Sequence, residues 1–176
     1  MFLKAQFTWN VAIPAETLSV EEQALQKAIF IRLLHDFATK KATKDHGYFR
    51  AVTTLDKIGK GKVMRNTGEL LFPVDFNAIT FKVFKGEIIE GIVNKVLKLE
   101  VVLKCGPFEN VFLSSQKMQD YKYIAGENLF FLSNKSSKIE KDEVVRCVVL
   151  GTKWAEADRE FSMLVSMDGD RLGLVA

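Results

Sequence analysis

The sequence predicts an α+β domain, with one helix packed on an antiparallel sheet, followed by a small closed β-barrel. Alternating apolar residues mark strands along most of the chain, and one amphipathic segment near the start marks a helix. After Glu87 the predicted strands are short and separated by turns, with no further helical period. The chain has 176 residues and is 48% hydrophobic, which is enough for two small domains that each have a core.

The first predicted strand covers residues 2–13. Phe7, Trp9, Val11 and Ile13 alternate with other residues, and Pro14 closes the run. Ser19 and Glu22 then match a capping box, in which the two side chains satisfy free backbone N–H groups.

We therefore expect a helix from about residue 20 to residue 40. Its apolar positions are Leu25, Ala28, Ile29, Leu33, Leu34 and Phe37, and Phe30 and Ile31 widen the stripe beyond what one sheet would cover. Two interpretations stay open. The helix is buried on most sides by its own domain, or part of it meets another subunit. Lys40, Lys41 and Lys44 suit the negative end of its dipole.

A second strand is predicted over residues 48–55, before a lysine-rich segment from Asp56 to Gly68. Its Gly59 and Gly61 form a GxG motif, but no helical period follows, so we interpret the segment as an exposed turn rather than a phosphate loop. The stretch from Thr67 to Gly91 then carries two extended apolar runs and should join the two domains. The predicted boundaries are 1–82 and 83–176.

The second half reads as a barrel of five or more strands. Strand patterns occur near residues 91–96, 101–103, 110–113, 144–150 and 161–165, and Gly106-Pro107 and Asp168-Gly169 are turn signals. At this size the usual closed barrel is the OB-fold. An insertion between Ser114 and Asp142, which contains Tyr121 and Tyr123, is predicted to hold an extra hairpin.

Composition and motifs favour no catalytic, metal or cofactor site. The net charge is +3, with 11 Lys and Arg against 8 Asp and Glu up to residue 81 and 14 against 14 afterwards, which is no polybasic footprint for nucleic acid. Cys105 and Cys147 lack a CxxC partner and are expected to be buried, reduced thiols. With two histidines, a histidine-based metal site is disfavoured. No membrane span or signal peptide is expected.

Several stretches resemble the seventh-subunit family of multisubunit DNA-dependent RNA polymerases. They are TTLDKIGKGKVMRNTGELLFPVDFNAITFKVFKGEIIEGIV, CGPFENVFLS and DYKYIAGE. Other stretches, among them WNVAIPAE, FATKKATK and KMQDYKYIAGEN, resemble the version in plant polymerases IV and V. The resemblance implies a truncated RNP-like tip domain, an OB-fold of the ribosomal S-one kind, a nuclear location and a role in RNA-directed DNA methylation.

The resemblance also implies partners. Members pair with the fourth subunit to form a stalk beside the RNA exit channel, and the segment from Asp56 to Gly68 would wedge against the polymerase core. Ile58, Gly59 and Gly61 are the positions carried over to that contact, and Met64 is a second apolar anchor within a lysine rim. The helix face around Phe30 and Leu34 and the insertion around Tyr121 and Tyr123 are further candidate partner surfaces.

The sequence differs from the family pattern at one motif that is important for RNA binding. Barrels of this type usually carry an aromatic, a glycine, a small residue and a second aromatic on the second strand, where this chain has Leu99, Glu100, Val101 and Val102. Because base stacking on an aromatic ring contributes about 1–3 kcal/mol per base, intrinsic RNA binding should be weak. The remaining candidates for contact with single-stranded RNA are Lys98, Lys104, Phe112 and Arg159.

The expected function is therefore a non-catalytic stalk subunit of a nuclear RNA polymerase. Rival hypotheses are an RNA polymerase II stalk subunit, a free-standing OB-fold RNA-binding protein, and a nuclease that pairs carboxylates not evident from spacing. A stalk subunit should be unstable without its partner, because large apolar patches seldom stay exposed. A free-standing protein should not depend on a partner.

Overall fold

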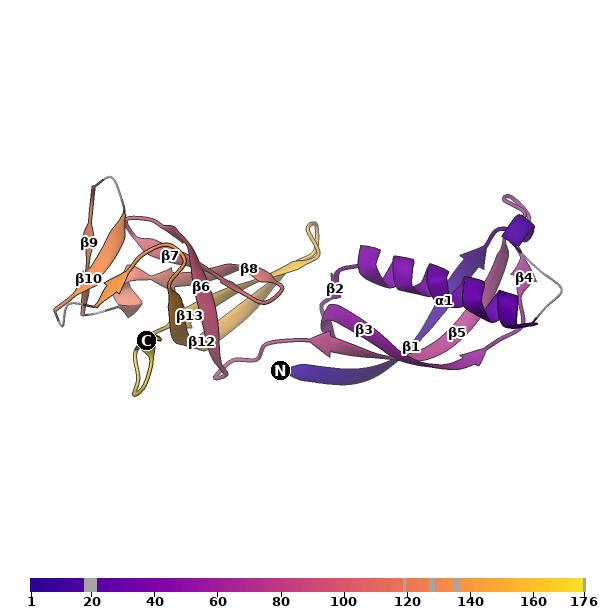
Figure 1. Cartoon of the computed structure of the whole chain (residues 1–176), viewed down its shortest axis with the longest axis horizontal. Coiled ribbons are helices and arrows are strands. Elements are labelled where there is room, and N and C mark those ends of the chain that lie inside the picture. Colours follow the sequence, from indigo (N-terminus) through magenta and orange to yellow (C-terminus); the bar gives the residue numbers. More distant parts are fainter. Residues whose placement is uncertain (18–21, 119, 127–128, 135–136, 176) are drawn as a thin grey trace. The chain divides into compact units, whose positions relative to one another are not determined.

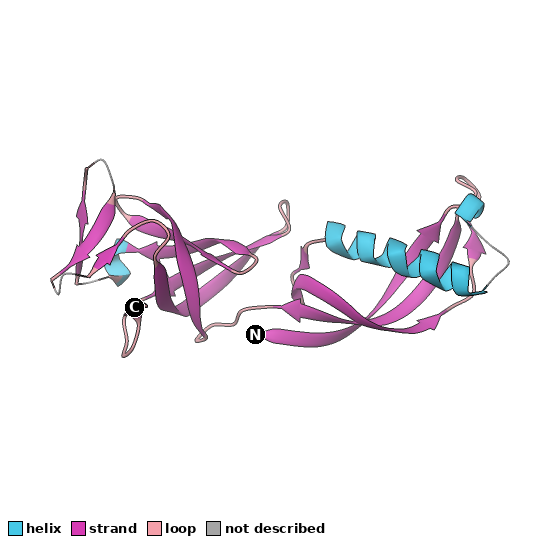
Figure 2. Cartoon of the chain, viewed as in Figure 1, coloured by secondary structure: helices cyan, strands magenta, loops and turns pink. Residues whose placement is uncertain are grey.

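The computed structural model describes residues 1–176 except 18–21, 119, 127–128, 135–136 and 176. Contacts divide the chain into two compact units, Met1–Lys82 and Val83–Ala176. Strands dominate both units, and among the described residues there is one α-helix, α1 (Glu22–Thr39), in the first unit (Figure 2). No helix in this described part is both long and apolar enough to cross a membrane.

The first unit is built around one central strand, β5 (Leu70–Phe81). It lies between β1 (Phe2–Ile13) and β3 (Gly47–Ile58), and both neighbours run antiparallel to it (Figure 1). The short strand β2 (Ala42–Thr43) extends the sheet beyond β3, and β4 (Lys62–Val63) also pairs with β5. The stretch from Thr67 to Gly91 does contain the boundary between the two units, but its first apolar run is an inner strand of the first sheet.

The register between β1 and β5 is unbroken from Phe2–Phe81 to Ile13–Leu70. Just before it, Met1 and Lys82 exchange both backbone hydrogen bonds: Met1 N donates to Lys82 O at 2.9 Å and Lys82 N donates to Met1 O at 3.1 Å. Because bonded and non-bonded pairs alternate in an antiparallel ladder, the odd-numbered residues of β1 bond to β5. The even-numbered residues of β1 direct their N–H and C=O groups to its outer side.

Helix α1 covers one face of this sheet (Figure 1). Ile29, Leu33 and Phe37, spaced by four residues, are buried against sheet residues that alternate along β1 and β5, namely Val11, Ile13, Phe72, Val74, Phe76 and Ala78. The opposite side of the helix exposes Phe30, Ile31 and Leu34, so of the two open interpretations the one in which the helix is buried on most sides by its own domain is wrong. The apolar stripe of the helix is wider than the surface that one sheet can cover, so part of the stripe stays exposed to solvent.

The ends of the helix differ in detail from the sequence expectation. The predicted capping box joins Ser19 to Glu22. Ser19 and the side chain of Glu22 lie outside the part of the chain that the structure describes. At the other end the helix stops at Thr39, and its last turn holds no basic residue. Lys40 follows directly, with its N–H bonded to Asp36 O at 3.1 Å, and its Nζ lies 3.8 Å from the centre of the Trp9 ring in a cation–π contact.

The second unit is a closed barrel of five strands. In spatial order they are β13 (Glu160–Ser166), β8 (Phe108–Ser114), β7 (Glu100–Cys105), β6 (Ile88–Val96) and β12 (Val144–Ala155), and β12 pairs back with β13. The β8–β13 pair is parallel and the others are antiparallel. A short strand, β14 (Gly173–Leu174), adds to β12. Alternate apolar residues of all five strands fill the interior, as the period-two pattern predicts.

The insertion between β8 and β12 forms a three-stranded sheet, one strand more than the predicted hairpin. It consists of β9 (Tyr121–Ile124), β10 (Phe130–Ser133) and β11 (Lys138–Ile139), with β10 in the middle. Phe131 and Ile139 are buried, so this sheet has an apolar side. Two single-turn helices, η1 (Ala15–Thr17) and η2 (Ser115–Lys117), complete the described elements.

Candidate partner and nucleic-acid surfaces

The expected polymerase-core segment begins where the ladder between β3 and β5 ends. Pro73 lies opposite Asn10 in a pair that does not bond to β1, so the side on which proline lacks an N–H faces β3 and β4. Its carbonyl accepts a hydrogen bond of 2.7 Å from the N–H of Gly59. The chain then crosses this gap through Gly59, Lys60 and Gly61 before β4 resumes the pairing.

Gly59 and Gly61 are required here by contact with their own domain. A Cβ at position 59 would lie 2.6 Å from Pro73 Cγ, and a Cβ at position 61 would lie 2.6 Å from Phe72 Cε1. Both distances are shorter than carbon atoms tolerate, and the Phe72 ring is buried. Their first role is thus to let this segment lie flat on β5.

The apolar side chains of the segment differ in what they can offer a partner. Ile58 packs on the core cluster of the first unit and is only partly exposed, so it is not a free anchor. Met64 is 37% exposed, and Val63, which the sequence reasoning did not select, is 68% exposed. Lys60, Lys62 and Arg65 are exposed around them. The free apolar surface at this edge is therefore Val63 with Met64.

The outer face of the barrel carries an aliphatic row with one aromatic ring. Phe112 on β8 lies between Val102 on β7 and Leu164 on β13, as direct cross-strand neighbours. Beyond Leu164 the next residue across is Gly151, where a shallow hollow of about 300 Å³ opens. The sequence reasoning named Phe112, and Val102 as a residue in the place of a stacking aromatic, but it missed Leu164, which occupies an outward position on its strand.

The four residues proposed for RNA contact do not form one cluster. Lys98 lies in the β6–β7 turn and Arg159 in the β12–β13 turn, at opposite ends of the barrel face, and Arg159 adopts a positive φ of 50°. Lys104 on β7 forms an ion pair with Glu109 at 3.0 Å. Only Phe112 lies at the centre of the face.

The residues compared with the aromatic stacking motif are also split between two environments. Leu99 stands in the turn and is 72% exposed, and Glu100 opens β7. Val101 points into the barrel and is fully buried, whereas Val102 points outward beside Phe112. Of these four positions, Val102 is the strand residue adjacent to the remaining ring.

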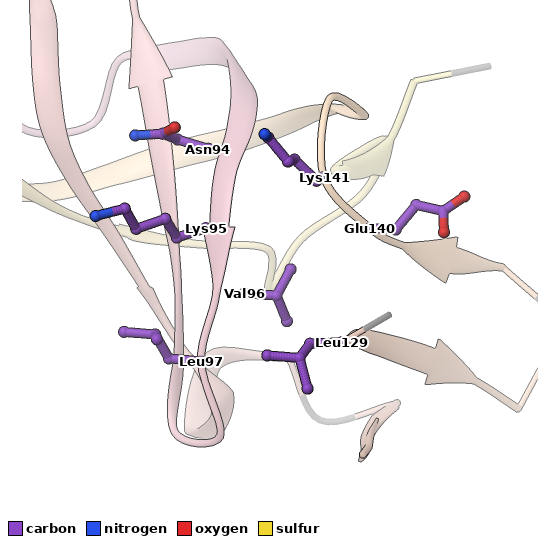
Figure 3. A pocket seen from close by; sticks show the side chains of 7 residues that line it. All are labelled: Asn94, Lys95, Val96, Leu97, Leu129, Glu140 and Lys141. Carbon is purple, nitrogen blue, oxygen red and sulfur yellow. The ribbon is translucent and has the colours of Figure 1, made fainter. Parts of the chain in front are cut away.

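A pocket of about 470 Å³ lies between the end of β6 and the insertion (Figure 3). Val96 and Leu129 stand in the middle of the view, while the charged ends of Lys95 and Glu140 point away from each other. Glu140 is paired with Lys138 at 2.5 Å. The pocket is lined by Asn94, Lys95, Val96, Leu97, Leu129, Glu140 and Lys141. The ionisable groups of this described lining are the Glu140 carboxylate and the ammonium groups of Lys95 and Lys141.

The other candidate surfaces and sites can be placed directly. Tyr121 and Tyr123 are half-buried on β9, and burial raises the pKa of the Tyr121 hydroxyl. Cys105 and Cys147 are free and buried in the barrel, as predicted, and burial raises the pKa of Cys147 to about 12. Within the described residues, no group of three or more His, Cys, Asp or Glu side chains is arranged to hold a metal ion.

Comparison with known proteins gives full-length relatives. The chain is 58% identical to DNA-directed RNA polymerase V subunit 7 of Arabidopsis thaliana over 173 residues, which is 98% of this chain and 97% of the relative. It is 51% identical to RNA polymerase IV subunit 7 of the same plant, over 98% and 99% of the two chains. An RNA polymerase II seventh subunit from Glycine max is 34% identical over 73% and 78%.

Other comparisons add little. No family model matches the chain. An exosome complex RNA-binding protein of known structure aligns with 55% of this chain and 49% of its own, at 15% identity and a TM-score of 0.38, which is too low to support an argument.

Identity of this extent over nearly whole chains defines the class, that of subunits of DNA-directed RNA polymerases. The chain belongs to the seventh-subunit family, and it is more similar to the Arabidopsis polymerase V and IV subunits than to the polymerase II subunits of Glycine max and Arabidopsis. Its mostly-β fold, with one helix and a closed five-stranded barrel, fits that family.

Proposed function

We propose that this chain is a non-catalytic stalk subunit of a nuclear RNA polymerase of the IV or V type. The observation that carries the proposal is the identity of 58% and 51% to the polymerase V and IV seventh subunits over 98% of the chain. In this proposal the first unit is the RNP-like tip domain, residues 1–82, and the second is an OB-fold domain, residues 83–176. The complex would act in RNA-directed DNA methylation.

The tip would dock on the polymerase core through the edge formed by β4 and its neighbours. Val63 and Met64 supply an apolar centre, and Lys60, Lys62 and Arg65 supply a basic rim, which is the usual anatomy of a small interface. The fourth subunit would cover other apolar surface, and the exposed helix residues Phe30, Ile31 and Leu34 are its first candidate.

The barrel would lie near emerging RNA and bind it weakly. One ring, Phe112, is a single stacking platform, and the nearby Lys104 is paired with Glu109 at 3.0 Å. Attachment to the polymerase would compensate for this weak intrinsic affinity, because a tethered site meets the transcript at a high effective concentration.

The test is a pull-down of the tagged chain from nuclear extract, followed by mass spectrometry. Recovery of a fourth-subunit relative with the largest subunit of polymerase IV or V is the expected result. The largest subunit of polymerase II in their place would assign the chain to that enzyme. Ribonucleoproteins without polymerase subunits would instead support a free-standing RNA-binding protein.

The docking edge is tested in the same assay with two matched variants. Val63→Asp should remove the polymerase core from the pull-down while the chain stays folded by circular dichroism, because Val63 contributes little to its own core. Leu99→Asp, at an equally exposed leucine in the barrel, should leave core recovery unchanged. Equal recovery with both variants would reject this edge as the contact.

A further inference from the structure

The pocket between the end of β6 and the insertion has two walls that belong to the same unit. One wall is residues 94–97, and the other comes from the insertion and the segment that follows it. Backbone hydrogen bonds join the two walls beside the pocket: Val93 N–H donates to Glu143 O at 2.8 Å, and Asp142 N–H donates to Val93 O at 2.9 Å. The fold itself therefore holds the walls in place, as is usual for binding pockets.

A β-bulge explains why consecutive residues of β6 line one pocket. In a regular strand successive side chains point to opposite faces, so only alternate residues can share a pocket. The register between β6 and β7 shifts between Val93 and Lys95, which makes Asn94 an extra residue on β6. Asn94 and Lys95 are both exposed and both line the pocket, whereas Val96 is buried. Bulges re-aim side chains in this way, and they are frequent beside functional sites.

The centre of the pocket is aliphatic. Leu129 of the insertion faces Val96 and Leu97 (Figure 3), and the two leucines are 41% and 44% exposed. None of the described lining residues is aromatic. Single-stranded nucleic acid binds largely by stacking its bases on aromatic rings, so this lining is suited to an apolar side chain of a polypeptide rather than to RNA.

The unpaired charge of the lining is positive on both walls. Glu140 is paired with Lys138 at 2.5 Å. Lys95 on one wall and Lys141 on the other form no ion pair with any residue that the structure describes. The nearby carboxylates of Asp142 and Glu143 lie outside the lining. An apolar side chain in the pocket would thus have an ammonium group on each side of it, which favours carboxylates in the flanking residues.

The same charges disfavour a second copy of this chain docked through the same surface. A two-fold contact brings a patch against itself, so the lysines of one copy would meet the lysines of the other. We propose that this pocket binds a short segment of a different protein. The segment inserts one apolar side chain between Leu97 and Leu129 and carries acidic residues on both sides of it. This proposal does not depend on the polymerase assignment.

A photo-reactive peptide tests this inference on the tagged full-length chain, isolated with its bound subunits. A wash at high salt first releases segments that are held by charge. The probe is a short biotinylated peptide with photoleucine at its centre and glutamate or aspartate at every other position. Mass spectrometry should locate its adduct within residues 94–97 or on Leu129 or Lys141. The same peptide with lysine in place of the acidic residues should give no adduct there. Equal labelling by both peptides, an adduct elsewhere or none at all overturns the proposal.

Charge reversal separates the two lysines of the pocket from the general charge of the unit. Lys95→Glu combined with Lys141→Glu should lower the adduct yield by about tenfold or more, because each new carboxylate repels the acidic probe. Lys117→Glu combined with Lys153→Glu is the matched control, since both lysines are exposed in the same unit and neither lines the pocket. The control should leave the yield unchanged. Equal yields from the two double variants would overturn the proposal.

The apolar wall has its own pair of variants. Leu129→Ser should lower the yield, whereas Leu99→Ser should not, because Leu99 is 72% exposed and lies outside the lining. Circular dichroism checks that both variants stay folded. Equal yields from these two variants would also reject the pocket.

Two further outcomes distinguish the alternatives. If an excess of the purified chain displaces the probe, a second copy is the occupant and the proposal of a foreign segment is overturned. The pull-down of polymerase subunits is a separate readout of the proposed function. Polymerase subunits recovered with a chain that fails to bind the probe would reject this pocket alone.

Discussion

Gly61 lies directly on the ring of Phe72, so closely that a Cβ at position 61 would stand 2.6 Å from Cε1 and 2.8 Å from Cζ. The ring is buried beneath the helix and has little room to move. This contact fixes the path of the chain from β3 into β4, and with it the position of Val63.

Gly61→Ala should therefore lower the free energy of unfolding of the first unit by roughly 1–3 kcal/mol, because the added methyl group overpacks a buried ring. Gly151→Ala is the matched control, since a Cβ there would meet nothing within 4 Å. Urea denaturation of both variants measures the difference. Equal stability of the two variants would contradict the close contact.

Thr80→Val should stabilise the chain by about 1 kcal/mol. Thr80 is fully buried on β5, and its Oγ1 has no hydrogen-bond partner, so the hydroxyl has lost its solvation without compensation. Thr8→Val is the control. The Thr8 hydroxyl donates to Asp75 Oδ1 at 2.6 Å, so its removal should lower the free energy of unfolding. Thermal unfolding of both variants tests the prediction, and destabilisation by Thr80→Val would point to a partner for this hydroxyl.

The stability of the barrel should fall at alkaline pH. Burial raises the pKa of Cys147 to about 12, with a smaller contribution from Cys105, so the folded state keeps a proton that the unfolded state loses from about pH 9. The stabilising contribution is complete below that pH and decreases by roughly 1.4 kcal/mol per pH unit as the pH rises toward 12. Below pH 8 this thiol should contribute no pH dependence.

Urea denaturation between pH 8 and pH 11 measures the effect against Cys147→Ala. The variant should be less stable at every pH because of its smaller side chain, but its stability should fall less steeply above pH 9. Parallel curves for the two proteins would mean that Cys147 titrates normally in the fold.

Val102→Phe should strengthen binding of single-stranded RNA by roughly 5- to 150-fold, which corresponds to the 1–3 kcal/mol of one stacking platform. Position 102 is outward-facing and directly beside Phe112, so the two rings would form a continuous surface. Phe112→Ala should act in the opposite direction. Fluorescence anisotropy with a labelled oligouridine at fixed salt compares the three proteins, and an unchanged affinity for both variants would exclude this face from RNA binding.

Much of the fold could be predicted from local patterns, because they report which side of an element is buried. The alternation of Phe7, Trp9, Val11 and Ile13 identified β1, and the short strands after Glu87 identified a barrel. The pairing of β1 with β5 could not be read from either strand alone, since it depends on contacts between residues far apart in the chain. The alternation at residues 70–81 therefore predicts a strand, but it does not show that this strand lies between β1 and β3.

The candidate sites were harder to predict because exposure depends on tertiary packing. Ile58 and Val63 are both β-branched residues in one lysine-rich segment, yet one packs on the core and the other does not. Likewise, Lys98 and Arg159 are plausible RNA contacts by type, but the strand register separates them to opposite ends of the barrel. Pairing partners, rather than residue types, determine which side chains share a surface.

The register of β1 has a consequence for how the protein is made. Its partners in β5 lie 70 − 13 = 57 to 81 − 2 = 79 residues further along the chain. At a synthesis rate of about 5–20 residues per second, the first strand waits roughly 3–14 s after its own completion before β5 has been translated. During that interval Phe7, Trp9, Val11 and Ile13 have no sheet to join, which makes the nascent first strand a natural client for a ribosome-associated chaperone.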